Sequence, residues 1–398
     1  LRTAIYNYLY AKRNKGKFLL RIEDTDKERS NKIYEKEILN IFDIFNLQYD
    51  NLIYQSKNLS VHQEYLEKLI STDLAYQSDD GPYKFRVKKD NDFFKYDDLI
   101  LGELKIPSNT IEDFSIARSD KTPTFILSNL IDDDFENVTN VIRGNDHTIN
   151  TVKQKMLSNA LNFKEIHYAH IPLIHDIEGK KLSKRDNITN VEDYLNDGYL
   201  AASIFNFIIK LGNNFNDIEY LNIDEAVKNF NLSKTVLSPA KFDIEKLNFI
   251  NQYYLKELSF SDFNKYLEKD VKDQVSSFKL EPIYKDILER CHKYTEINSE
   301  VVKLYDFFKK NSVLEIDKNE KDLIKKIHTI INNLHDNDNT ISILEKNGLP
   351  LKKIGKIIRK ITVNFESKIP IEKIFIFFGI ENIKERLLLY INDWWKKI

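Results

Sequence analysis

A run of cations, a glycine and a hydroxyl lies close to the middle of the chain. Residues 179–185 read Gly-Lys-Lys-Leu-Ser-Lys-Arg and follow the predominantly apolar residues 171–174. Lysine acts as a point charge toward phosphate oxygens, and glycine lets the backbone bend around them. The run therefore predicts a loop that closes over a polyphosphate, although a solvated lysine-rich loop has the same composition.

Carboxylates gather where another apolar segment ends. The residues Phe-Leu-Leu at 18–20 run directly into Arg-Ile-Glu-Asp-Thr-Asp at 21–26. Ligands of an open α/β sheet bind beyond the carboxyl ends of its strands, and acids placed there are costly without a cationic partner. One interpretation is a ligand site. The other is a turn in which Asp24 or Thr25 caps a helix that begins near Lys27.

An arginine ends a third segment of the same build, Val-Ile-Arg-Gly-Asn-Asp-His at 141–147. An arginine at a strand end can hold a carboxylate through two parallel hydrogen bonds. The carboxylate partner of Arg143 is then either a ligand or a structural acid such as Asp132 or Asp133.

The elements that position these segments follow from the spacing of apolar residues. Helical spacing predicts helices at 3–12, 30–45, 60–72 and 152–161, with Ser60 and Gln63 forming the N-terminal cap of the third. Residues 18–22 predict a strand, 97–104 a strand and turn, and the chain from 191 onward is mainly helical. Alternating strands and helices favour a doubly wound nucleotide-binding fold.

Taken together and in this order, the segments resemble bacterial glutamyl-tRNA synthetase, a class I aminoacyl-tRNA synthetase. The matching stretches are 1–30, 118–125, 141–147, 170–186 and 238–251. The resemblance implies an α/β fold, with a class I Rossmann-like nucleotide-binding catalytic domain that carries a short acceptor-binding insertion. All-α stem-contact and anticodon-binding domains would follow.

The resemblance also divides the chain. It implies a catalytic domain in two halves, 1–72 and 120–195, around an insertion at 73–119, followed by a stem-contact domain at 196–256 and an anticodon-binding domain at 257–398. The family's first strand and its HIGH signature precede the equivalent of Leu1. We therefore expect that the sequence lacks its start; the alternative is a natural paralogue that has lost catalysis.

Roles for individual residues come from the resemblance as well. It implies glutamate binding by Glu23, Phe125, Asn129 and Arg143, and contact with the tRNA end by Asp26 and Arg29. It implies a catalytic role for Lys181 and Lys184, within a set of ATP-binding residues formed by Lys181, Leu182, Ser183, Lys184, Arg185, Asp146 and His147.

Two positions depart from the family pattern. Phe125 stands where tyrosine is usual, which removes a hydroxyl worth about 0.5–1.5 kcal/mol as a net hydrogen bond. Asn145 stands where glutamate is usual.

The implied activity is that of a glutamate–tRNA ligase. ATP, bound with Mg²⁺, activates glutamate to glutamyl-adenylate, and the terminal adenosine of tRNA(Glu), and in some members also tRNA(Gln), accepts the glutamyl group. Two alternatives stay open, a catalytically inactive tRNA-binding paralogue and a glutamyl-queuosine-type synthetase that modifies a tRNA base. The helical segment from about 255 onward disfavours the second alternative, because those enzymes lack an anticodon domain.

Composition is compatible with this assignment. The net charge of −2 does not by itself indicate a nucleic-acid partner. The single cysteine, Cys291, excludes a cysteine-rich zinc site, so we expect no zinc, and it fits a reducing cytoplasm. No apolar run reaches about 18 residues, so we expect no transmembrane helix. We expect a monomer.

Overall fold

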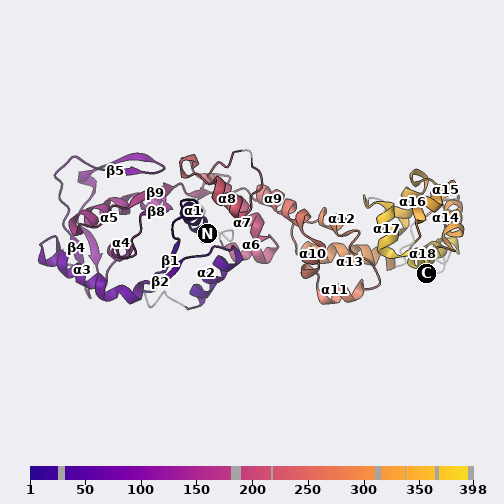
Figure 1. Ribbon diagram of the computed structural model, residues 1–398, viewed down its shortest axis with the longest axis horizontal. Helices are drawn as coiled ribbons and strands as arrows, with labels where there is room; N and C mark the ends of the chain where they lie inside the picture. The colour runs from indigo at the N-terminus through magenta and orange to yellow at the C-terminus, as the bar shows by residue number, and fades with distance from the viewer. Residues whose placement is uncertain are drawn as a thin grey trace. The chain divides into compact units, whose positions relative to one another are not determined.

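The computed structural model describes residues 1–25, 32–180, 190–216, 218–309, 315–336, 338–363 and 367–392. The chain divides into two units, and each is compact by itself (Figure 1). The first unit contains Leu1–Glu192 and Ile204–Ile244, and the second contains Asp193–Ser203 and Glu245–Ile398.

The first unit begins with a strand–helix–strand arrangement. Helix α1 (Arg2–Arg13) buries Ile5 and Leu9 on one face, which confirms the helix predicted at 3–12. Strand β1 (Leu19–Ile22) pairs in parallel with β2 (Asn51–Tyr54), and α2 (Lys32–Ile44) lies between them in sequence. This parallel pairing across a helix is the repeating unit of the predicted fold.

The cap predicted for the third helix is wrong. Helix α3 (Leu59–Ser71) continues directly from a turn of 3-10 helix, η1 (Gln55–Asn58), and Ser60 already lies inside it. The residue before the helix is Asn58, whose side chain makes no capping hydrogen bond. Because the 3-10 turn already directs the chain along the helix, no separate cap is needed at Ser60.

A four-stranded sheet, in the order β6-β5-β9-β8, supports most of the candidate site. Strands β8 (Asn140–Gly144) and β9 (His167–Ile171) are parallel, with Arg143 opposite His170. Strand β5 (Phe93–Asp98) pairs with β9 at Asp98 and turns into β6 (Gly102–Pro107), which confirms the strand and turn expected at 97–104. Residues expected in the insertion thus share a sheet with residues expected in the second catalytic half.

Two helices come before and after strand β8 in sequence. They are α4 (Phe125–Phe135) and α5 (Thr148–Leu161), and α5 begins one turn earlier than the helix predicted at 152–161. A short turn, η3 (Asn145–His147), joins β8 to α5. The helices α3, α4 and α5 share a buried apolar cluster with a second sheet, formed by β3 (Ala75–Gln77), β4 (Tyr83–Phe85), β7 (Phe114–Ala117).

The remaining elements of the first unit are short. Strand β10 (Ile174–His175) pairs in parallel with β11 (Ala240–Lys241). Two more short turns, η2 (Ser108–Thr110) and η4 (Leu232–Lys234), precede β7 and β11. Helix α8 (Ile223–Asn229) packs near α1, while α6 (Val191–Asp197) and α7 (Ala201–Lys210) lie at the sequence boundaries of the two units.

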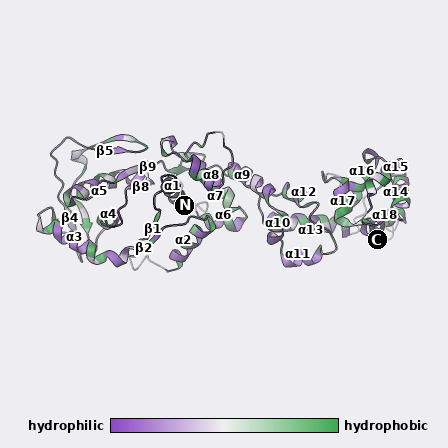
Figure 2. Cartoon of the chain, in the orientation of Figure 1, coloured by the Kyte–Doolittle hydropathy of each residue, from purple (hydrophilic) through white to green (hydrophobic). Residues whose placement is uncertain are grey.

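The second unit is mainly helical in the part of the chain that the structure describes, as predicted for the chain after 191. Its helices are α9 (Ile244–Glu257), α10 (Phe260–Tyr266), α11 (Lys269–Gln274), α12 (Tyr284–Leu288), α13 (Glu296–Lys309), α14 (Lys318–Ile331), α15 (Thr340–Lys346), α16 (Leu351–Thr362), α17 (Ile371–Phe378), α18 (Ile380–Ile391). Hydrophobic and hydrophilic residues alternate along these helices (Figure 2).

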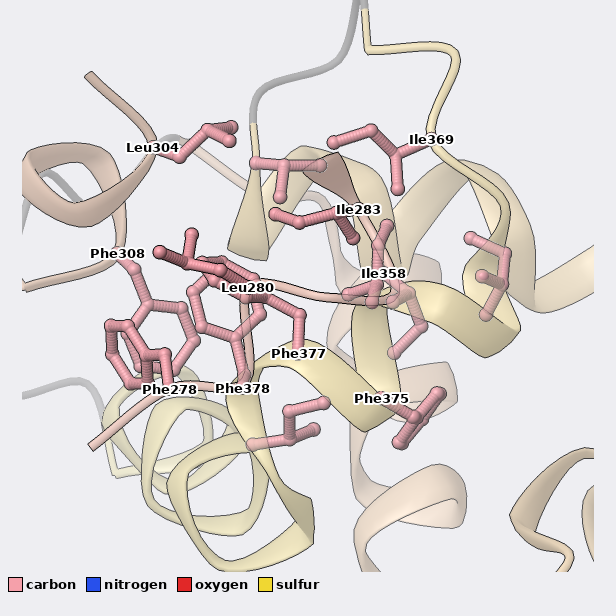
Figure 3. Packing of buried hydrophobic residues seen from close by; sticks show 14 of the residues in the cluster. Phe278, Leu280, Ile283, Leu304, Phe308, Ile358, Ile369, Phe375, Phe377 and Phe378 are labelled. Carbon is pink, nitrogen blue, oxygen red and sulfur yellow. The ribbon is translucent and has the colours of Figure 1, made fainter. Parts of the chain in front are cut away.

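One apolar core joins the helices of the second unit. Its aromatic centre is Phe278, Phe308 and Phe378, which lie together in Figure 3. The rings of Phe308 and Phe378 are stacked, with centroids 3.9 Å apart and an interplanar angle of 16°. Among the described residues, no helix is both long and apolar enough to cross a membrane.

Candidate functional site

The structure brings together five residues that the sequence predicted for the site. Asn129 on α4 donates a hydrogen bond from Nδ2 to Glu23 Oε1, just beyond β1, at 2.8 Å. Phe125 lies one turn before Asn129, and its ring centroid is 5.8 Å from that of His147. Arg143 is the penultimate residue of β8, and the turn that carries His147 follows the strand. Residues from three separate sequence motifs therefore meet at the ends of the strands.

A buried amide and a buried acid fix the orientation of Asn129. Gln55 donates from Nε2 both to Asn129 Oδ1 at 2.8 Å and to Asp132 Oδ2 at 2.9 Å. Because the oxygen of Asn129 accepts from Gln55, its nitrogen must be the atom that faces Glu23. Asp132 Oδ1 also lies 2.8 Å from Asn58 Nδ2 and 2.7 Å from His62 Nε2. Burial favours the neutral acid, but these hydrogen bonds hold the pKa of Asp132 below its ordinary value.

An ion pair lies beside this network. Arg21 on β1 donates from Nη1 to Asp133 Oδ1 at 2.6 Å, and its Nε is 4.0 Å from Asp132 Oδ2. The interpretation that pairs Arg143 with Asp132 or Asp133 is therefore not realised in the described structure, because Arg21 is the cation that those acids face.

Arg143 has a different set of partners. Its Nη2 donates to Thr151 Oγ1 at 2.6 Å and to Gln154 Oε1 at 2.8 Å, and its Nε points to His170 Nε2 at 3.4 Å. The guanidinium also lies 5.1 Å from the centre of the Tyr168 ring. Among residues 1–25, 32–180 and the rest of the described chain, no carboxylate forms an ion pair with it.

This environment disfavours the charge on Arg143. Burial lowers the pKa of the guanidinium, and the nearby Tyr168 and Asp133 only partly offset that effect. Arginine nevertheless stays protonated in proteins. A partly buried cation without an anionic partner is costly, so the arrangement is suited to receive an anion.

Sequence reasoning missed the residues that hold Arg143 in place. His170 and Asp98 are both buried, and His170 Nδ1 lies 2.6 Å from Asp98 Oδ2. Burial alone would raise the pKa of Asp98, but the bond from His170 and those from two backbone amides keep it below the ordinary value. One signal was available: His170 is a polar residue inside an apolar strand, and such a residue needs a partner.

The other predicted residues have varied surroundings. Both carboxylate oxygens of Asp24 accept from Ser56, from its backbone amide at 2.8 Å and its hydroxyl at 2.6 Å. Asp146 is exposed and His147 is half-buried. Burial, and next the charge of Arg143, lowers the pKa of His147, so its imidazole is more easily neutral.

The predicted phosphate loop and tRNA contacts lie outside the described residues. This applies to Lys181, Leu182, Ser183, Lys184, Arg185, Asp26 and Arg29. The turn before residue 181 is described: Gly179 has a φ of +91°, and Lys180 donates its backbone amide to Asp176 Oδ1 at 2.8 Å. The glycine thus adopts a conformation that other residues rarely take.

The chain is similar to a set of known proteins. The family model described as "tRNA synthetases class I (E and Q), catalytic domain" matches residues 1–91 and 77–249. Glutamate–tRNA ligase 2 of Neorickettsia sennetsu is 35% identical over 395 residues, which cover 97% of this chain and 94% of that protein. Glutamate–tRNA ligase 1 of Nitratiruptor sp. is 37% identical over 339 residues, covering 76% of this chain and 77% of that protein.

A solved structure shares the fold. It is the glutamate tRNA ligase from Elizabethkingia meningosepticum in complex with its amino acid, with a TM-score of 0.80 at 24% sequence identity. The similarity covers 98% of this chain and 95% of that one. An α/β region followed by a helical region is thus common to both structures.

Proposed function

The chain belongs to the glutamate–tRNA ligases, within the class I tRNA synthetases, and on this premise we propose that Arg143 binds the side-chain carboxylate of glutamate. The observation that carries the proposal is the set of partners of Arg143, which contains hydroxyl, amide and imidazole groups but no described carboxylate. Glutamate would supply the missing anion. Glutamine would leave the guanidinium without one, and a site of this kind rejects such a substrate strongly.

We propose that Glu23 receives the ammonium group of the same substrate. Glu23 is exposed at the end of β1, and Asn129 holds one of its oxygens. The second oxygen of the carboxylate can accept from an incoming ammonium group. Phe125, 38% exposed and close to His147, provides an apolar surface beside the same site.

ATP binding is proposed for the loop at 181–185 with Asp146 and His147. The α-carboxylate of glutamate attacks the α-phosphorus of ATP, the bond to pyrophosphate breaks, and glutamyl-adenylate forms. Lys181 and Lys184 would stabilise the charge that develops on the phosphate oxygens, and Mg²⁺ would enter with ATP. Replacing Lys184 by alanine should lower the rate of adenylate formation by about 10²-fold or more. An unchanged rate of ATP–pyrophosphate exchange would refute this role.

Transfer to tRNA is the second proposed step. Asp26 and Arg29 would contact the acceptor end, and the terminal adenosine would take the glutamyl group from the adenylate. The predicted division at 72, 119, 195 and 256 would separate the catalytic, insertion, stem-contact and anticodon-binding parts. We further propose a monomeric, cytoplasmic enzyme that needs no zinc.

Charging assays test this function directly. The complete protein, ATP and labelled glutamate are incubated with purified tRNA(Glu) and tRNA(Gln) in separate reactions. Label on tRNA(Glu) would support the ligase, and label on both would define a wider tRNA range. Intact tRNA binding without label would contradict it and support a catalytically inactive paralogue.

A further inference from the structure

We propose that Asp98 and His170 form a positioning pair that orients Arg143, and that Asp98 thereby determines the selectivity for glutamate. The inference rests on the proposed role of Arg143 in binding the glutamate side chain. Neither Asp98 nor His170 would contact the substrate, since both act through the guanidinium.

The sheet brings the three residues together. Strands β8 and β9 place Arg143 opposite His170, and β5 joins β9 at the pair Asp98 and Tyr168. The backbone amide of His170 lies 3.3 Å from Asp98 Oδ1, so main chain and side chain hold the pair together. The imidazole packs against two rings, those of Tyr96 and Tyr168, with centroids 6.3 and 6.4 Å away. His170 is therefore held in one orientation.

The hydrogen bonds of Asp98 determine which nitrogen of His170 carries the proton. Its Oδ1 accepts from the backbone amides of Ile100 at 2.9 Å, Leu101 at 2.8 Å and His170 at 3.3 Å. Among the described residues, the imidazole is the hydrogen-bond partner of its Oδ2, at 2.6 Å from Nδ1. An ionised carboxylate can only accept, so Nδ1 must be the donor and Nε2 of the neutral ring carries a lone pair.

That lone pair faces the guanidinium. Arg143 Nε lies 3.4 Å from His170 Nε2, and the hydroxyl of Thr151 lies 2.9 Å from the same nitrogen. If Nε2 carried a proton, the N–H of His170 and the Nε–H of Arg143 would be two donors that face each other. With Nε directed at His170 and Nη2 bound to Thr151 and Gln154, Nη1 has no hydrogen bond to the described residues. The pair therefore leaves Nη1 for an incoming carboxylate.

The substitution Asp98→Asn tests this arrangement with almost no change of shape. The three backbone amides require an oxygen at the position of Oδ1, so the new NH₂ group must replace Oδ2 and face Nδ1. His170 must then accept at Nδ1 and carry its proton on Nε2, opposite the N–H of Arg143. We expect the KM for glutamate to rise about 10- to 100-fold, the KM for ATP to stay nearly unchanged, and selectivity over glutamine to fall.

A matched control is available on the next residue. Asp97 is exposed on the opposite face of β5, and Asp97→Asn removes the same charge from the same strand. We expect no change in the KM for glutamate from this control. An equal effect of Asp97→Asn and Asp98→Asn would overturn the proposal, because net charge alone would then explain both.

A double substitution separates positioning from a structural role. If Asp98 acts through Arg143, then Asp98→Asn should add little to the effect of Arg143→Ala on glutamate use. Additive effects would overturn the positioning role while leaving the role of Arg143 intact. If Arg143→Ala itself leaves the KM for glutamate unchanged, the proposed function of Arg143 fails instead.

Nitrogen NMR of the unmodified protein keeps the proposal testable even if Asp98→Asn fails to fold. The chemical shifts of the His170 ring, assigned by comparison with a His170→Gln variant, report the tautomer directly. We expect the proton on Nδ1 near neutral pH. A proton on Nε2, or on both nitrogens, would overturn the proposal.

Discussion

Two arginines of the first unit lie near the ends of strands in two different sheets, yet their hydrogen-bond partners differ in kind. Arg21 on β1 forms an ion pair with Asp133 at 2.6 Å and lies 4.0 Å from a second carboxylate, Asp132. Arg143 on β8 has a hydroxyl, an amide and an imidazole as its described hydrogen-bond partners. The first arginine already has its anion, whereas the second has no carboxylate partner among the residues that the structure describes.

The difference separates a structural cation from a binding one. In a buried ion pair each charge is already compensated by the other, so the cation has little attraction left for an anionic ligand. A cation held by neutral groups keeps its charge for a ligand, and the fold bears the cost until the ligand arrives. The side chains of Arg21 and Asp133 are only 18% and 10% exposed. Loss of either residue would therefore leave the other as a charged group with little access to water and without its partner.

The largest expected effect comes from Arg143→Ala. Removing one member of a desolvated charge pair should raise the KM for glutamate by about 10²- to 10³-fold, with little change in the KM for ATP. Steady-state ATP–pyrophosphate exchange measures both constants. Equal effects on glutamate and ATP would remove the distinction between the two arginines.

The reverse pattern is expected for Arg21→Ala. Asp133 would lose its partner inside the fold, and we expect a loss of about 3–5 kcal/mol of stability, measured as a lower urea midpoint. The KM for glutamate of the folded protein should change little. As a comparison, Arg143→Ala should lower the urea midpoint less, because it removes hydrogen bonds to Thr151 and Gln154 but leaves no described carboxylate without its cation.

A smaller effect on glutamate use is expected from Thr151→Val. The hydroxyl of this buried residue bridges Arg143 Nη2 and His170 Nε2, at 2.6 and 2.9 Å. Its loss leaves both partners less satisfied and should raise the KM for glutamate by about tenfold. Thr148→Val, one turn earlier on α5, is the matched control and should have no such effect.

The smallest effect is expected from Phe125→Tyr. A hydroxyl added beside the proposed glutamate site is worth about 0.5–1.5 kcal/mol, so the KM for glutamate should fall by about two- to tenfold. Phe135→Tyr, at the exposed opposite end of α4, provides the control. A rise in KM with Phe125→Tyr would indicate that the ring is packed more closely than its exposure suggests.

Sequence reasoning identified the segments that meet at the site because each is continuous in the chain. A strand that ends in a polar cluster is visible at Glu23 and at Arg143, and the structure brings both into one neighbourhood. The helices and the strand predicted for the first 72 residues are also present, since their apolar spacing is regular.

The residues that hold Arg143 in place could not be predicted from continuous segments of the sequence. Asp98 lies in a segment interpreted as part of an insertion, and its pairing with His170 depends on how β5 meets β9. Register between distant strands is set by tertiary packing, which a local pattern does not contain. The same limit explains Ser60, where a preceding 3-10 turn replaced the expected cap.

The central claim is that Arg143 recognises the side-chain carboxylate of glutamate. It is tested most directly by comparing glutamate with glutamine as substrates. The two amino acids differ only in the group that would meet the guanidinium. We predict that kcat/KM for ATP–pyrophosphate exchange favours glutamate by on the order of 10³-fold or more, and that Arg143→Ala removes most of this preference. A preference that survives Arg143→Ala would contradict the account, because another residue would then distinguish the carboxylate from the amide.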